Sequence, residues 1–502
     1  MFKKLLVFVS AVSLLFIIGC GKQSSVPSAD LVIKNAKIVT IDKESPRAEA
    51  VAIKGEYILA VTSNENIDLY IEEGITTVID AKGRLVVPGF NDAHCHFRGM
   101  NPDYVELRFV TDPKVITERV KEQVARSKPG ELIRGGHWEH EEFYNQQWPT
   151  KELIDPVSPD NPVVLSRVDG HSSLVNSYVL KASGITKDTP DPFGGEIQKD
   201  PVTGEPTGIF KENARRLLMY GAVEVKRTPE QAEERRMREW QTAFDTAARL
   251  GITTIHLPPG NFEMYQKFRD MGKLTVRVFV GQPLTEDEEQ LQQYAELQKQ
   301  YPPDDNWIRF GFLKAFCDGT LGSATMLMYE PFADEPGKTG LAMMPYEELE
   351  RKVVKADKMG FQIAIHAIGD KGVNWTLNMF EKAQQVNGVR DSRHRIEHVQ
   401  FITSEDIPRF AELGVIPSMQ AVAVLTEQRF AEKRVGYERC KNAYAWKKLL
   451  DAGAKVAFST DYGVEPLDPL QGLYAGVTRK LRSGKGPSWF PDQCLTMEKT
   501  IE

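Results

Sequence analysis

The strongest constraint on the fold is an alternation of two sequence patterns that continues from Val86 almost to the end of the chain. Short apolar, β-branched runs predict strands buried on both faces, and longer stretches with apolar residues at helical spacing predict amphipathic helices. So many repeats of this alternation predict an α/β fold built on a closed (β/α)8 barrel of the TIM type. The runs that predict strands are 252–255, 276–280, 308–316, 361–365, 414–418 and 455–459, and those that predict helices are 229–250, 285–300, 346–359, 376–385 and 404–413.

The remaining segments predict additions to this barrel. Residues 30–87 contain short alternating runs separated by Asp, Asn and Lys-Gly punctuation, which predicts a small antiparallel β unit that forms most of a β-sandwich domain. The barrel itself is expected within 88–475. It contains more candidate strands than eight, so we expect an insertion within about 98–306. Residues 476–502 are interpreted as the start of a C-terminal region.

Composition excludes several classes of protein. Hydrophobic residues make up 41% of the 502 residues and charged residues 26%, which is typical of globular proteins and disfavours disordered, collagen-like and polytopic membrane chains. The net charge of -7, without a long basic run, gives no basis for binding nucleic acid. Five cysteines without a CxxC pair cannot form a disulfide framework or a structural zinc knuckle.

The N-terminus predicts export. Lys3 and Lys4 precede an apolar run from Leu5 to Ile18, which is too short for a comfortable membrane span and is typical of a signal peptide. The segment 16–20, Phe-Ile-Ile-Gly-Cys, resembles a bacterial lipoprotein lipobox. That resemblance implies removal of 1–19, lipidation of Cys20, a tether over 20–29 and an extracytoplasmic, lipid-anchored location on a bacterial membrane. The alternative is a soluble export signal cut elsewhere.

Two histidines follow the first predicted barrel strand in the run Val86-Val87-Pro88-Gly89-Phe90-Asn91-Asp92-Ala93-His94-Cys95-His96. Residues two apart in a strand face the same way, so both imidazoles can converge on a metal. An HxH triplet is weak evidence alone, because it also arises by chance. Three later predicted strand ends finish with His366, His398 and Asp461. Since the carboxyl ends of barrel strands meet at one mouth, these side chains are predicted to form a metal site.

Further motifs accompany these ligands along the chain. From about Asp30 to its end, the chain resembles the metal-dependent amidohydrolase superfamily, and within it the amidohydrolase 3 group of YtcJ-like proteins. Besides the HxH element, the matching segments are Asp169-Gly170-His171-Ser172, Gly204-Glu205-Pro206-Thr207-Gly208, Lys314 with Asp318-Gly319-Thr320-Leu321-Gly322-Ser323, His366-Ala367-Ile368-Gly369-Asp370, and Asp461 with Pro466-Leu467-Asp468-Pro469-Leu470.

The resemblance implies roles for these residues. His94 and His96 would hold one metal that Asp461 also touches, and a second metal would lie at the other two histidines, His366 and His398. Lys314 would be an N-carboxylated bridge, and His171 a substrate contact or transition-state stabiliser. Nitrogen and oxygen ligands without a thiolate favour one or two zinc ions, with manganese, iron or nickel as alternatives.

Lys314 lies in the apolar run 311–316, where an unpaired ammonium would cost several kcal/mol. Carboxylation would replace this cation with an anionic ligand. The alternatives are a buried ion pair with Asp318 and a mononuclear site.

Other residues are weaker candidates. His394 lies four residues before His398 but is expected at the bottom of the barrel, so we reject it as a ligand. His137, His140 and His256 are interpreted as packing or surface residues. Trp138, in an aromatic segment, and Asp318 are candidates for the substrate pocket, although Trp138 is explained equally well by packing.

These observations predict hydrolysis of a non-peptide carbon-nitrogen bond, in a small amide or N-substituted formamide, by metal-activated water with Asp461 as general base. The alternatives are a mononuclear cyclic amidine deaminase and a surface-anchored metal- or ligand-binding lipoprotein without turnover.

Members of the amidohydrolase 3 group continue beyond the segment matched by 495–502, so we expect an incomplete small β domain with an unpaired strand edge beside 31–41. The sequence does not indicate an oligomeric state.

Overall fold

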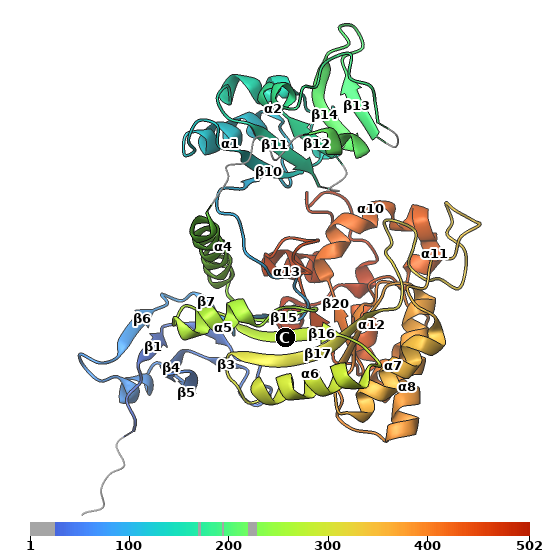
Figure 1. The fold of residues 1–502 in the computed structure, drawn as a ribbon. Coiled ribbons are helices and arrows are strands. Elements are labelled where there is room, and N and C mark those ends of the chain that lie inside the picture. Colours follow the sequence, from blue (N-terminus) through green and yellow to red (C-terminus); the bar gives the residue numbers. More distant parts are fainter. Residues whose placement is uncertain (1–25, 169–171, 193–194, 219–227) are drawn as a thin grey trace, which may run out of the picture. The chain divides into compact units, whose positions relative to one another are not determined.

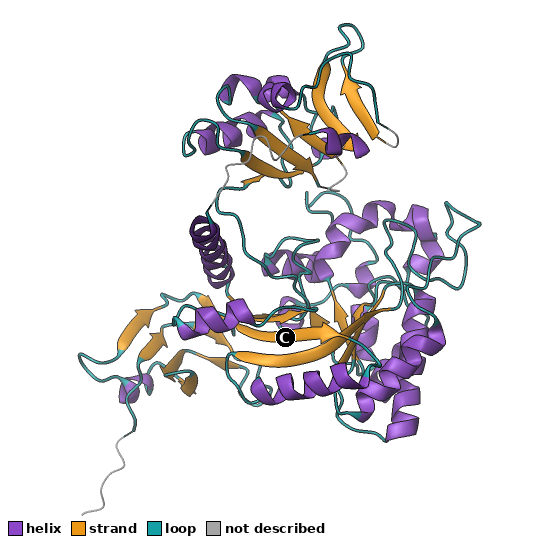
Figure 2. Ribbon diagram, viewed as in Figure 1, coloured by secondary structure: helices purple, strands orange, loops and turns teal. Residues whose placement is uncertain are grey.

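A computed structural model describes residues 26–168, 172–192, 195–218 and 228–502. The chain divides into two compact units, one comprising residues up to Gly89 together with Glu502 and the other Phe90–Ile501. Figure 1 traces both units along the chain, and Figure 2 distinguishes their helices from their strands.

The first unit contains two small sheets. One has the strand order β5-β4-β1-β6 and the other β3-β2-β7. The pairing is mixed, and not purely antiparallel as expected, because β1 pairs in parallel with β6 and β2 in parallel with β7. The strands are β1 (Leu31–Lys34), β2 (Lys37–Val39), β3 (Arg47–Ala48), β4 (Ala50–Lys54), β5 (Tyr57–Thr62), β6 (Thr77–Asp80) and β7 (Leu85–Val86).

The second unit contains the predicted barrel. Eight parallel strands follow the order β21-β20-β19-β18-β17-β16-β15-β8, and the amide of Ala93 donates to the Phe458 carbonyl at 3.3 Å between the two end strands. The fold class is therefore confirmed as α/β with a nearly closed barrel and additional small sheets. The strands are β8 (Phe90–Asp92), β15 (Ile252–Leu257), β16 (Arg277–Pro283), β17 (Ile308–Phe316), β18 (Ile363–Ala367), β19 (Arg395–His398), β20 (Ile416–Met419) and β21 (Ala457–Phe458).

Local sequence accounts for these barrel elements. All five residues of β18, Ile-Ala-Ile-His-Ala, are buried, as a parallel strand covered on both faces requires. Helix α4 begins at a capping box between Thr228 and Gln231, with Pro229 in its first turn. The helices of this unit outside the insertion are α4 (Pro229–Arg249), α5 (Glu263–Asp270), α6 (Glu288–Gln300), α7 (Tyr346–Lys358), α8 (Asp370–Asn387), α9 (Ile407–Glu412), α10 (Val424–Val435), α11 (Tyr437–Cys440), α12 (Trp446–Asp451), α13 (Pro469–Thr478) and α14 (Met497–Ile501).

An additional six-stranded sheet lies between β8 and α4 in the sequence, with the order β13-β14-β12-β11-β10-β9. We expected an insertion within about 98–306. The strands of the additional sheet lie within 105–212, so the insertion is shorter than expected. The later part of the expected range contains β15 and β16, which belong to the barrel. Strands β9, β10 and β11 are parallel. The elements are β9 (Val105–Glu106), α1 (Lys114–Val124), β10 (Ile133–Trp138), β11 (Val163–Arg167), β12 (Ser172–Val175), α2 (Ser177–Ala182), β13 (Gly195–Lys199) and β14 (Pro206–Glu212).

Of the helices in the described ranges, none has the length and apolar character needed to span a lipid bilayer.

Candidate metal centre

Three of the predicted ligands form a tight group at the carboxyl ends of β8 and β21. One ligand atom from each of His94, His96 and Asp461 lies within 4.8 Å of the others. Asp461 Oδ1 is 3.5 Å from His94 Nε2 and 3.3 Å from His96 Nε2. Such convergence of two imidazole nitrogens and a carboxylate oxygen is suited to a divalent metal ion.

Two more predicted ligands continue from this group as a chain of imidazole rings. The His398 ring centroid lies 5.3 Å from that of His94 and 4.3 Å from that of His366. Gln420 Oε1 lies 2.7 Å from His398 Nδ1, and the Gly319 carbonyl lies 2.9 Å from His366 Nε2. The ring nitrogens left for a metal are therefore Nε2 of His398 and Nδ1 of His366.

Burial sets the protonation of these rings. It lowers the pKa of His94 and of His366, and it lowers the pKa of His398 to about 4. Because metals bind the neutral imidazole, the site is in the correct state near pH 7. His96 differs from the other rings, with a side chain that is 45% exposed.

The backbone is strained at two of these ligands. His398 has φ 80° and Asp461 has φ 54°, both in the left-handed region that non-glycine residues rarely adopt. Such strain persists where surrounding structure enforces it, and it is concentrated at functional sites.

A fully buried ion pair supports His94 from within the barrel. Glu397 Oε2 is 2.8 Å from His94 Nδ1, and its Oε1 accepts a hydrogen bond from Arg395 Nε at 2.6 Å. Burial alone would raise the pKa of Glu397, but the Arg395 charge holds it well below its ordinary value. The ionised carboxylate therefore fixes His94 as the Nδ1–H tautomer, with Nε2 directed toward Asp461.

Lys314 lies buried in β17, 4% exposed. Burial lowers the pKa of its amine to about 8. Within the described part of the chain, Lys314 Nζ and Asp461 Oδ1 are buried polar atoms without a hydrogen-bond partner. Since burying an unpaired polar atom is costly, both are suited to a group that the protein itself does not supply.

The structure corrects both substrate-pocket assignments. Asp318 is 1% exposed, and its carboxylate accepts hydrogen bonds from the backbone amides of three residues, so it fastens loops together and is not available to a substrate. These amides belong to Leu327, Ile368 and Gly369. Trp138 is fully buried in the core of the insertion and donates to the Leu165 carbonyl at 2.9 Å, which makes it a packing residue.

The other described histidines have partners outside the candidate ligand set. His394 Nε2 is 3.0 Å from Asp357 Oδ1 of α7, and its ring stacks on Phe380 of α8, so it faces the helices and not the barrel floor as expected. His256 accepts from Arg395 Nη1 at 3.1 Å, and His140 stacks on Trp148. The predicted residues Cys20 and His171 lie outside the described residues.

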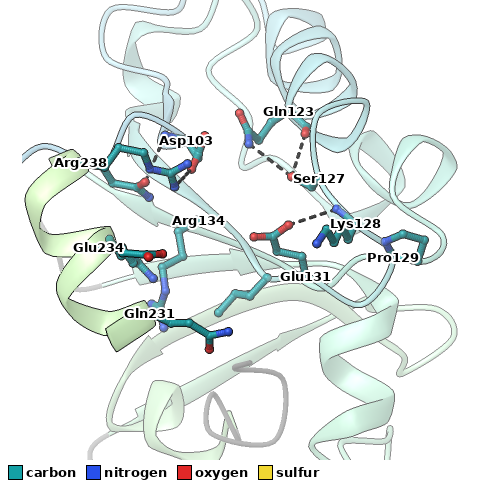
Figure 3. A pocket seen from close by; sticks show the side chains of 13 residues that line it. Asp103, Gln123, Ser127, Lys128, Pro129, Glu131, Arg134, Gln231, Glu234 and Arg238 are labelled. Atoms are coloured by element: carbon teal, nitrogen blue, oxygen red, sulfur yellow. Dashed lines mark hydrogen bonds and ion pairs between the residues drawn. The ribbon is translucent and has the colours of Figure 1, made fainter. Parts of the chain in front are cut away.

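A cavity of about 520 Å³ lies elsewhere in this unit, beside α4 and α1. Charged side chains of both signs line it, and Arg238 forms an ion pair with Asp103 at 2.7 Å (Figure 3). None of the lining residues is a candidate metal ligand.

Comparison with known proteins decides the family. Residues 77–502 match the model of the amidohydrolase family. The chain belongs to this family. The amidohydrolase is 31% identical to YtcJ of Bacillus subtilis over 476 residues, which are 93% of this chain and 87% of that protein. It is 26% identical to an N-substituted formamide deformylase of Arthrobacter pascens over 491 residues, 94% of this chain and 87% of that enzyme.

A solved structure supports the fold of this amidohydrolase. An uncharacterized metal-dependent hydrolase from Pyrococcus furiosus is 27% identical, with a TM-score of 0.66, and the match covers 94% of this chain and 92% of that one.

Sequence reasoning on this amidohydrolase missed the residues that orient the ligands. Arg395 and Glu397 are two apart in a buried strand, so alternation places both side chains on one face, and opposite charges there indicate an ion pair. That signal was present in the sequence. Gln420 follows β20 and carries no comparable local pattern.

Proposed function

We propose that this protein hydrolyses a non-peptide carbon-nitrogen bond in a small amide or N-substituted formamide. The observation that carries the proposal is the convergence of His94, His96 and Asp461, with their ligand atoms within 4.8 Å, at the carboxyl ends of barrel strands. Family membership and the similarity to an N-substituted formamide deformylase support the same class of reaction.

The side chains present fit a divalent metal. Buried neutral imidazoles and an unpartnered carboxylate oxygen form the donor set that zinc prefers. His94, His96 and Asp461 would hold one ion, and His366 and His398 a second. A divalent metal at this position supplies water activated as a nucleophile near neutral pH.

The chain's own residues would handle the protons. The carboxylate of Asp461, whose Oδ1 faces the two imidazoles, would take the proton of the attacking water and return it to the departing nitrogen. Glu397 keeps His94 in the tautomer that leaves Nε2 without a proton. For His171, we propose contact with the substrate carbonyl as its negative charge develops.

Product analysis tests this function. The metal-loaded protein is incubated with amides, N-substituted formamides and cyclic amidines, and the products are identified. Release of an amine and a carboxylic acid or formate supports the proposal. If only the cyclic amidines react and release ammonia, the result would favour a cyclic amidine deaminase. Absence of turnover on the whole panel would favour a metal- or ligand-binding protein without catalytic activity.

We also propose that Lys314 is N-carboxylated and bridges two metals. Its neutral amine would add to carbon dioxide with loss of one proton, and the ammonium form would lose one more proton beforehand, so a buried cation becomes an anion. Lys314→Ala is expected to lower the bound metal from two ions to one per chain, measured by inductively coupled plasma mass spectrometry. Lys447→Ala, which removes an exposed lysine paired with Asp451, is the control and should keep both ions. One ion per chain in both the unmodified protein and Lys314→Ala would indicate a mononuclear site.

For the location we propose a lipid anchor at Cys20, in keeping with the lipobox-like segment 16–20. In a bacterial host, the full chain is expected to partition into the detergent phase of Triton X-114, and Cys20→Ser to move to the aqueous phase. Detergent partitioning that does not depend on Cys20 would contradict the anchor.

A further inference from the structure

Helix α10, which follows β20, carries a half-buried carboxylate at Glu427. This residue lies in the first turn of the helix, and part of its side chain still reaches solvent. Its Oε2 accepts a hydrogen bond from the Tyr444 hydroxyl. None of the described residues forms an ion pair with Glu427. Since removing a carboxylate from water without a counter-charge is costly, Glu427 is suited to a positively charged group that binds from outside.

Further acceptor oxygens lie around this carboxylate. Gln400 is 5% exposed, and its Oε1 is a buried atom without a hydrogen-bond partner. The Gln400 carbonyl accepts from the Tyr444 amide at 2.7 Å, and the Gln400 side chain lowers the pKa of Glu427 by hydrogen bonding. Thr426 in the same helix donates to Glu465 Oε1 at 2.9 Å. The group formed by Gln400, Glu427 and Glu465 is therefore rich in acceptors, as an ammonium group with three N–H donors requires.

The charges in this group are not balanced. Glu465 Oε2 lies 4.0 Å from Arg482 Nη2, so one of the two carboxylates has a cation nearby. Burial raises the pKa of Glu427 to about 7, and the charge of Glu465 adds to this rise. A cation bound at Glu427 would offset both effects and favour its ionised form.

The same group adjoins two candidate metal ligands. Gln400 follows His398 by two residues, and the Glu465 amide donates to the Asp461 carbonyl at 3.2 Å. The charge of Asp461 raises the pKa of both Glu427 and Glu465. Since the effect of one charge on another falls with distance, both carboxylates lie near this ligand.

From this geometry we propose that Glu427 and Gln400 bind a protonated amine on the nitrogen substituent of the substrate. The inference rests on the proposed function and narrows the substrate class to N-(aminoalkyl) amides and formamides. The positive charge of the ammonium group matches the Glu427 carboxylate, and its N–H groups match the unpartnered Gln400 oxygen. An alkyl substituent of the same length offers neither.

The test uses formamides, because a formamide carries substituents only on its nitrogen. N-(aminoalkyl)formamides of increasing chain length are each matched with the N-alkylformamide in which a methyl group replaces the ammonium group. The metal-loaded full chain is expected to show a higher kcat/KM for the best charged compound than for its neutral partner. Glu427→Gln should lower this ratio by about 10–100-fold, the equivalent of a hydrogen bond to a charged group. Gln400→Met, which removes the unpartnered oxygen, should lower the ratio to a smaller extent.

Glu438→Gln is the matched control. Glu438 is exposed on α11 and pairs with Lys441 at 2.6 Å, so its replacement removes the same charge from a solvated pair and should keep the ratio. The inference is overturned if no charged compound is preferred over its neutral partner, if Glu427→Gln keeps the ratio, or if the control lowers it equally.

Failure of the proposed function has a separate outcome. If the unmodified protein hydrolyses no compound of either series, the proposed function fails, and calorimetric binding of the same compounds decides on the cation site. Tighter binding of the charged series that is lost in Glu427→Gln would support the site. Equal binding of both series, or binding of neither, would overturn it.

Discussion

Asp461→Asn is expected to lower kcat by about 10²–10⁴-fold, the range typical of a lost general acid or base. The amide keeps nearly the same volume but cannot take a proton from water, and it is a weaker ligand than a carboxylate. Burial alone would raise the pKa of Asp461, but the neighbouring His96 ring holds it well below its ordinary value, so the native side chain is ionised at neutral pH. Steady-state kinetics, with the metal content of each preparation, would measure the loss.

Asp451→Asn serves as the control for this substitution. Asp451 is exposed at the end of α12, where it pairs with Lys447, and its neutralisation should leave kcat within twofold of the unmodified protein. Retention of more than a tenth of the activity by Asp461→Asn at full metal occupancy would show that another group moves the proton.

Glu397→Gln is expected to have the largest effect on stability. Glu397 is fully buried and Arg395 is 4% exposed, so the substitution leaves a guanidinium inside the barrel without its counter-charge. Breaking a buried pair in this way typically costs about 3–5 kcal/mol. Loss of the carboxylate partner of His94 should also weaken metal affinity by about 10–100-fold. Urea unfolding and competitive chelator titration measure the two effects.

The double variant Arg395→Met with Glu397→Gln separates these two roles. Removing the cation as well should restore part of the free energy of unfolding, because no unpaired charge remains. The metal affinity should stay low, since His94 still lacks its carboxylate. If affinity returned together with stability, Glu397 would have only a structural role.

Sequence patterns predicted the barrel well because buried parallel strands leave a strong local signal. The run 308–316 coincides with β17, and the stretch 346–359 differs from α7 by one residue. The ligands were found because each follows a predicted strand, and barrel topology brings strand ends together. The registers of the small sheets could not be predicted, since β1 pairs with β6 across more than forty intervening residues.

The supporting contacts of the site were harder to foresee. Asp318 was a candidate for the substrate pocket, but backbone amides of loops far apart in sequence donate to both of its carboxylate oxygens. Tertiary contacts of this kind have no periodic signature.

Anomalous scattering from crystals of the metal-loaded protein, collected on both sides of the zinc absorption edge, tests the metal centre most directly. We expect a peak bounded by His94, His96 and Asp461, and a second beside His366 and His398 if Lys314 is carboxylated. If the protein is fully loaded with zinc but the anomalous peaks lie only at other residues, the result would contradict the assignment of the carboxyl ends of the barrel strands as the catalytic site.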